Sequence, residues 1–197
     1  MGLDITLLAV DWAHLRAIPA DSRTAWLEDA AWPDDQWPPH EEYQSGWTWP
    51  EGPGEQHWAR YAFTMSSYKP HFWAGRRWDD VRDAAHPELR VALDTYLLAL
   101  VWEGPDGDVR HDGPVFPGDP RDPEPLAVCR PADLPAVAEA WERAAPLLDT
   151  LRAPYAEHAE DPHGWIRDFD QFAAFVREWS VPVEEAARRG WGLIGLR

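Results

Sequence analysis

The sequence predicts one domain of the α+β class, a single mixed α/β domain over residues 1–197 with helices packed on a small sheet. Strand-like segments lie near both ends of the chain and after residue 125. The segments between them repeat apolar residues with the 3.6-residue period of helices. The length of 197 residues suits one domain, which at this size buries a core without disulfide bonds.

Alternation and capping residues indicate the first elements. Residues 3–10 alternate polar and apolar side chains with the period of two that is typical of a half-buried strand. Asp11 is expected to cap a short helical turn, and Asp21 or Ser22 is expected to cap a short helix that carries Trp26. The chain therefore begins as a strand followed by two short helices.

Periodicity and helix-boundary residues place the later elements. They are a helix from Pro87 with His86 at its N-cap, a buried strand over 126–129, a helix from Asp133 that ends or kinks at Pro146, a helix over 169–179 that Pro182 interrupts, a short helix that ends at Gly190, and a closing strand over 191–196.

Residues 32–54 form the most irregular stretch, with five prolines and four tryptophans among acids and glycines. No helical or strand period fits it. Disordered segments are poor in aromatic residues, so this composition argues against disorder. We expect a long, ordered aromatic and proline-rich loop, packed on the domain or closing over it as a lid.

Residues 56–78 stand apart from the rest of the chain because they contain no Asp or Glu. An even distribution of the 35 acids over 197 residues would place about four there. The stretch also holds Lys69, which is the only lysine, together with three arginines, two histidines and seven aromatic residues. We refer to residues 56–78 as the acid-free stretch.

Within the acid-free stretch, Trp58, Tyr61 and Met65 have the spacing of one helical face. Residues 66–78 contain a proline and a glycine and are expected to form a loop that presents charge. This aromatic and basic loop is the predicted ligand-binding site for an anion. Its residues are Tyr68, Lys69, His71, Trp73, Arg76 and Arg77. The alternative interpretation is structural, with the cations neutralising acids of the same chain and the aromatics packing.

No catalytic or metal-binding motif is present in the sequence. Cys129 has no second cysteine to pair with and lies in an apolar segment, which favours burial over catalysis. The histidines and acids of residues 157–163 match no metal-ligand spacing and indicate a solvated acidic loop. Phosphate-binding glycine motifs are also missing. The expectation is therefore no metal, no cofactor and no catalytic residue.

The net charge of −17 bounds the partners. It argues against nonspecific nucleic-acid binding and against docking on anionic lipid, because both would repel the chain. No apolar run is long enough to cross a membrane, and no secretory signal pattern opens the sequence, so a cytoplasmic bacterial protein is expected. The acid surplus suits a basic protein partner, and the acid-free stretch suits a small anionic ligand.

Three functions stay open from the residues alone. The first is a noncatalytic binding or interaction protein with an acidic surface. The second is a small-molecule binder or enzyme that uses residues 66–78 as an anion pocket. The third is a homo-oligomeric structural component, in which some of the fourteen tryptophans would form the interface.

The C-terminal part of the chain resembles a known family. Residues 129–134 open a helix after a strand, and Phe169, Phe172 and Phe175 precede Gly190 and a terminal strand. This arrangement is similar to the YfbM-like bacterial proteins of unknown function, which are small mixed α/β domains. The resemblance covers about a third of the chain, and it implies a fold class without implying any site residue.

Overall fold

The structure is a computed structural model that describes residues 4–32, 44–50, 56–105, 115–116, 125–159 and 165–196. Within them, five antiparallel strands form one sheet in the order β2-β3-β1-β5-β4. The strands are β1 (Thr6–Val10), β2 (Gly46–Thr48), β3 (Trp58–Ala62), β4 (Ala127–Cys129) and β5 (Gly192–Leu196). The α-helices are α1 (Trp12–Ala17), α2 (Ala20–Ala31), α3 (Tyr68–Val81), α4 (Pro87–Leu98), α5 (Leu134–Ala144), α6 (Arg152–His158) and α7 (Phe169–Arg189). Two 3₁₀ helices, Arg82–Ala84 and Ala145–Leu151, follow α3 and α5.

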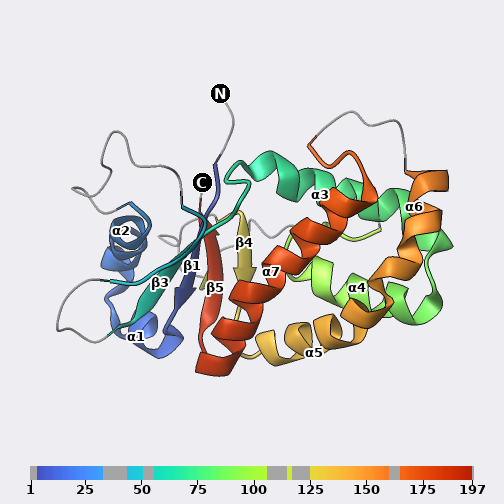
Figure 1. Cartoon of the computed structure of the whole chain (residues 1–197). Helices are drawn as coiled ribbons and strands as arrows, with labels where there is room; N and C mark the ends of the chain where they lie inside the picture. Colours follow the sequence, from blue (N-terminus) through green and yellow to red (C-terminus); the bar gives the residue numbers. More distant parts are fainter. Residues whose placement is uncertain are drawn as a thin grey trace.

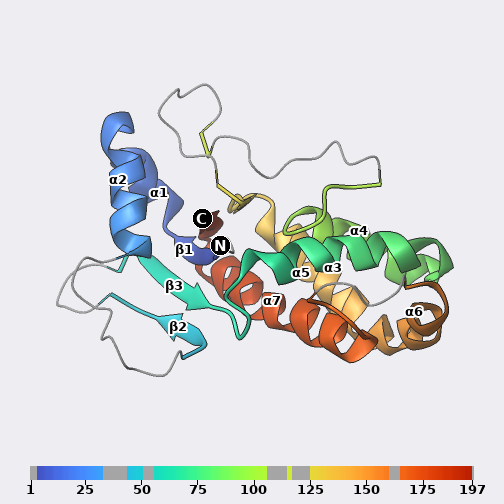
Figure 2. The ribbon, with the colours of Figure 1, turned by 90° about the horizontal axis from the view of Figure 1, so that it is seen from above.

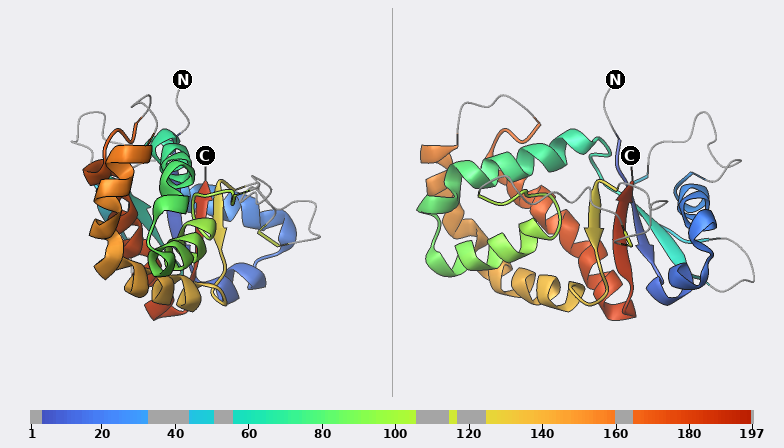
Figure 3. Two further views of the ribbon diagram at one scale, coloured as in Figure 1. Left: turned by 90° about the vertical axis from the view of Figure 1, so that its right-hand side faces the viewer. Right: turned by 180° about the vertical axis from the view of Figure 1, so that it is seen from behind.

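The sheet lies between a small and a large helical layer, which confirms the predicted α+β class. α1 and α2 cover one face, while α3 to α7 gather on the other (Figures 1 and 3). The central strand β1 alternates between the two layers, with Leu7 and Ala9 in the larger core and Leu8 and Val10 in the smaller one. Because both faces are covered, β1 and β5 are apolar at almost every position.

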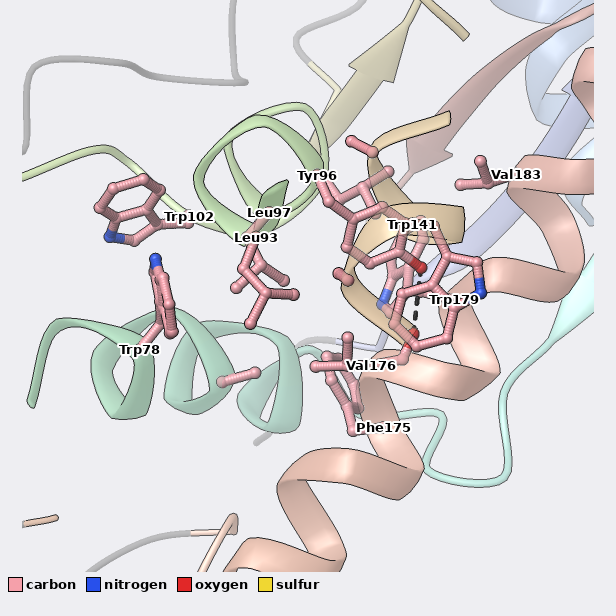
Figure 4. Close-up of a cluster of buried hydrophobic side chains, with 14 of the residues drawn as sticks. Trp78, Leu93, Tyr96, Leu97, Trp102, Trp141, Phe175, Val176, Trp179 and Val183 are labelled. Atoms are coloured by element: carbon pink, nitrogen blue, oxygen red, sulfur yellow. Dashed lines mark hydrogen bonds between the residues drawn. The ribbon is translucent and has the colours of Figure 1, made fainter. Parts of the chain in front are cut away.

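The larger core extends from one face of the sheet into the helical layer, where the helices pack on one another (Figure 4). Trp78, Tyr96 and Trp179 are among its largest fully buried side chains. The Tyr96 hydroxyl donates a hydrogen bond of 3.0 Å to the Val176 carbonyl, so the phenol is buried without losing its partner. These aromatic residues join α3, α4 and α7 in one core.

Most predicted boundaries are confirmed. The Asp11 carboxylate accepts from the amides of Ala13 and His14, and His86 caps α4 through its imidazole. Gly190 ends α7 in the left-handed conformation, with φ of 66°, as a C-terminal glycine should. The start of α2 is different, because the helix begins at Ala20 with Pro19 at its N-cap.

Pro182 was expected to interrupt the last helix, and this prediction is wrong. α7 runs unbroken from Phe169 to Arg189 with Pro182 inside it. A proline within a helix costs about 3 kcal/mol. Trp179, Val183 and Ala186, on either side of it, are buried at 0–1% exposure. Their burial against the sheet and α5 outweighs the cost.

Only part of the aromatic stretch 32–54 can be compared with its prediction, because residues 33–43 and 51–55 lie outside the described residues. The expectation that it contains no regular structure is wrong at Gly46–Thr48, which pairs with β3. Trp47 contacts Tyr61 edge-to-face at 5.0 Å. Trp49 lies 4.1 Å from the Arg189 guanidinium, which a cation–π interaction favours. These contacts attach β2 to the sheet and to the end of α7.

The first residue of β5 must be glycine, because a Cβ at Gly192 would overlap the ring of Trp12. We expect Gly192→Ala to destabilise the fold by about 2 kcal/mol through overpacking. Gly195→Ala is the matched control, since its nearest side-chain atom would be the Ile5 Cδ1 at 3.1 Å. The midpoint of urea unfolding measures both. Equal losses in the two variants would contradict this account of Gly192.

Candidate functional site

The acid-free stretch folds differently from its prediction. Residues 58–62 form β3, not a helix, with Ala59 and Tyr61 buried in the alternation of a strand. Trp58 packs against the smaller core, on the opposite face of the sheet from Tyr61. The apolar residues of this strand therefore belong to two faces, and their helical spacing is a coincidence. The helix lies later, at Tyr68–Val81, where a loop over residues 66–78 was expected.

α3 forms despite its proline and glycine. Ser67 caps it by accepting from the Lys69 amide, and Pro70 lies in the first turn, where no intrahelical N–H bond is lost. Gly75 is required because a Cβ there would lie 2.9 Å from the Val101 carbonyl oxygen. The helix therefore uses both residues where they are tolerated. Figure 2, which views the molecule from above, shows α3 crossing the helical layer.

His71 lies on the inward face of α3 and is fully buried. Its ring contacts Phe63, Phe175 and Trp179 edge-to-face, and the Trp179 indole N–H donates to its Nδ1 at 3.2 Å. Because Nδ1 accepts, the proton of the neutral ring is on Nε2, which has no hydrogen-bond partner among the residues that the structure describes. Burial lowers the pKa of His71 to about 3. This imidazole is a neutral core group and cannot reach a ligand at the surface.

Arg77 is also turned inward, and the structural interpretation holds for it. Its side chain is 3% exposed. The Nε donates to the Ile166 carbonyl at 3.1 Å, and an ion pair of 2.9 Å joins the guanidinium to Asp80. The guanidinium also lies 5.5 Å from the Trp73 ring. Arg77 therefore holds the segment before α7 against α3.

The other predicted residues lie at or near the surface. Tyr68 is half-buried and parallel to the His71 ring at 6.1 Å, and Trp73 is half-buried against the core. Lys69 and Arg76 are exposed. The structure thus turns His71 and Arg77 into the core and leaves the other four predicted residues at or near the surface.

Lys69, Phe72, Trp73 and Arg76 lie at positions i, i+3, i+4 and i+7 of α3, which is one face of a helix. We call these four residues the α3 stripe. Phe72 is 41% exposed, and the Arg76 guanidinium lies 5.4 Å from its ring. Within the described part of the chain, neither Lys69 nor Arg76 has a carboxylate within ion-pair distance. Phe72 was not among the predicted site residues, although it lies three residues after Lys69 and four before Arg76, which is the spacing of one helix face.

A second polar cluster, which the sequence did not predict, lies where α1 meets β3. The Asp11 Oδ2 is 3.2 Å from the His57 Nδ1, and the His57 and His14 rings stack at 3.6 Å. Burial acts to raise the pKa of Asp11, but hydrogen bonds from His14, His57 and Ala13 outweigh it and leave the pKa lowered. Asp11 is also the α1 cap, so the cluster fastens this helix to the sheet. The spacing of Asp11 and His14 was its only signal in the sequence.

Cys129 and the possible metal ligands show no reactive or metal-binding arrangement in the part of the chain that the structure describes. Cys129 is buried, and burial, with the nearby Asp133 carboxylate, raises the pKa of its thiol to about 12. It is therefore an unreactive thiol at neutral pH. Among the residues with described positions, no three His, Cys, Asp or Glu side chains are grouped to hold a metal ion. None of the described helices is long and apolar enough to cross a membrane.

Comparisons with known proteins add no relative. No family model matches the chain, and no curated protein or solved structure matches it either. From its own structure, the protein is an α+β domain that carries a cationic and aromatic face on α3.

Proposed function

We propose that the chain is a noncatalytic binding protein that holds an anionic partner on the α3 stripe. The observation that carries this proposal is the position of Lys69 and Arg76. Acids outnumber basic residues 35 to 18 in this chain, yet these two exposed cations lie on one helix face and form no ion pair with a carboxylate of the described residues. The Asp79 carboxylate, three residues after Arg76, interacts with it only through its field. Phe72 and Trp73 lie between them and add apolar contact area.

The net charge does not prevent such binding at physiological salt. At 0.15 M ionic strength the Debye length is about 8 Å, so repulsion from distant acids is largely screened. A carboxylate that contacts Arg76 interacts mainly with that guanidinium, which fits a planar oxyanion. Local charge therefore decides what binds at the stripe.

Titration with a glutamate-rich peptide, followed by amide NMR shifts, tests the proposal. We expect the largest shifts at residues 69–76, and the Lys69→Ala, Arg76→Ala double variant should weaken binding by about tenfold or more. Arg143→Ala is the control, because Arg143 is an exposed helical arginine already paired with Glu139 at 2.8 Å. Shifts confined to other elements, or an unchanged affinity in the double variant, would refute an α3 site.

The net charge also favours a second candidate, a basic protein partner held by the acidic surface. Exposed carboxylates such as Asp83, 92% exposed, are available to such a partner. Acidic surfaces steer basic partners and raise association rates at low salt. A polylysine probe would bind this surface, and its affinity would not depend on Lys69 or Arg76. We retain in this proposal the expected bacterial cytoplasmic location and the resemblance to the YfbM-like family.

A further inference from the structure

The charges of α3 run against its dipole. A helix favours acids in its first turn and bases in its last. α7 follows this rule, with Asp170 in its first turn and Arg188 and Arg189 in its last. α3 has no acid in its first turn, which contains Lys69, and no base in its last. Each reversed charge costs about 0.3–1 kcal/mol, so helix stability does not account for Lys69. A negative group bound beside the first turns would interact favourably with both the lysine and the dipole.

The spacing of the stripe selects the kind of anion. Lys69 and Arg76 are seven residues apart, which is about 10 Å along the helix axis. A single carboxylate or phosphate contacts only one of them at a time. The two cations together need two anionic groups at a matching separation. Phe72 and Trp73 occupy the space between, so the groups between the two anions must be apolar.

An α-helix supplies this pattern when it lies alongside α3. It has the same rise of 1.5 Å per residue, so acids at positions i and i+7 match Lys69 and Arg76. Apolar residues at i+3 and i+4 then lie over Phe72 and Trp73. We infer that the α3 stripe docks an acidic amphipathic helix of a partner protein, with two acids seven residues apart and apolar side chains between them. This inference rests on the proposed anion-binding function and names its partner.

Two synthetic peptides of about 15 residues, long enough to form an isolated helix, test this inference. The first has Glu at i and i+7 and Leu at i+3 and i+4. The second has the same residues with a central proline added, which prevents a continuous helix. Calorimetric titration at physiological salt should show the helical peptide binding at least tenfold more tightly.

Variants locate the contact. Arg76→Glu and Phe72→Ala should each weaken binding of the helical peptide by about tenfold or more. Arg143→Glu changes the net charge by the same amount as Arg76→Glu and should leave the affinity unchanged. A peptide with Lys in place of the Glu that faces Arg76 should restore binding to Arg76→Glu and bind the natural chain poorly.

The outcomes separate the two proposals. If the proline peptide binds as tightly as the helical one, and both depend on Lys69 and Arg76, the anion site stands and the helix is wrong. If neither peptide responds to the variants, both proposals fail. If sedimentation shows that the chain self-associates and Arg76→Glu abolishes this, the occupant is a second copy, which overturns the inference.

Discussion

Lowering the pH from 7 to 5 is expected to reduce the free energy of unfolding of the natural chain by about 2 kcal/mol more than that of the His71→Asn variant. The pKa of His71 is about 3 in the folded protein, against 6.5 for an unburied imidazole. Between these values the unfolded chain binds a proton at this residue and the folded chain does not. Stability therefore falls as the pH falls, by up to about 1.4 kcal/mol for each pH unit.

The window between pH 7 and pH 5 separates this effect from acid titration of the carboxylates, most of which stay ionised there. Asn is the chosen replacement because its side-chain oxygen accepts the Trp179 indole hydrogen bond while the group has no titration. The smaller side chain leaves a cavity that lowers stability at every pH. The measured quantity is accordingly the difference between the free energies of unfolding at the two pH values.

Phe175→Leu provides the control for a weakened core, since Phe175 contacts the His71 ring but has no proton to exchange. Phe175→Leu should be less stable than the natural chain by the same free energy of unfolding at pH 7 and at pH 5. The nitrogen NMR signals of His71 should report the neutral Nε2–H ring in the folded protein at pH 5. A protonated ring at that pH, or an unchanged pH dependence in His71→Asn, would show that the imidazole is accessible to water.

The sequence predicted the fold class because its strongest signals are local. Asp11, His86 and Gly190 act within a few residues of themselves, so their roles as caps are visible without tertiary structure. Pro70 and Pro182 are different. Each looks like a boundary in the sequence, and each lies inside a helix, because one occupies a first turn and the other is enclosed by buried neighbours. Burial at that level depends on contacts far along the chain.

The predicted binding segment, residues 66–78, was expected to be a loop, and most of it lies in the helix α3. A lack of acids over residues 56–78 marked the region, and α3 lies within and just beyond it. Composition cannot tell which side of a helix a cation occupies. Arg76 and Arg77 are neighbours in the sequence, yet one is exposed and the other is 3% exposed and paired with Asp80. The period of 3.6 residues separates them once the segment is known to be helical.

Replacing Asp94 with Ala is expected to cost about 3 kcal/mol of unfolding free energy. One Asp94 oxygen accepts from the Trp78 indole N–H at 2.9 Å, and both oxygens accept from the Arg82 guanidinium at 2.6 and 2.7 Å. Ala would leave the buried indole N–H and the partly buried guanidinium without this partner. Loss of one partner from a buried ion pair costs about 3–5 kcal/mol. Asp94 and Arg82 are about a quarter exposed, so the expected cost is at the lower end.

Asp83 is the matched control because it lies 3.5 Å from the same Arg82 but is 92% exposed. Asp83→Ala should cost at most about 0.5 kcal/mol, since water screens this pair. Asp94→Asn should fall between the two, because the amide oxygen still accepts from Trp78 while the charge that faces Arg82 is lost. Urea unfolding at neutral pH measures all three variants. Equal losses for the two alanine variants would contradict this account. They would mean that the hydrogen bond from the Trp78 indole, which only Asp94 accepts, contributes little to holding α3 against α4.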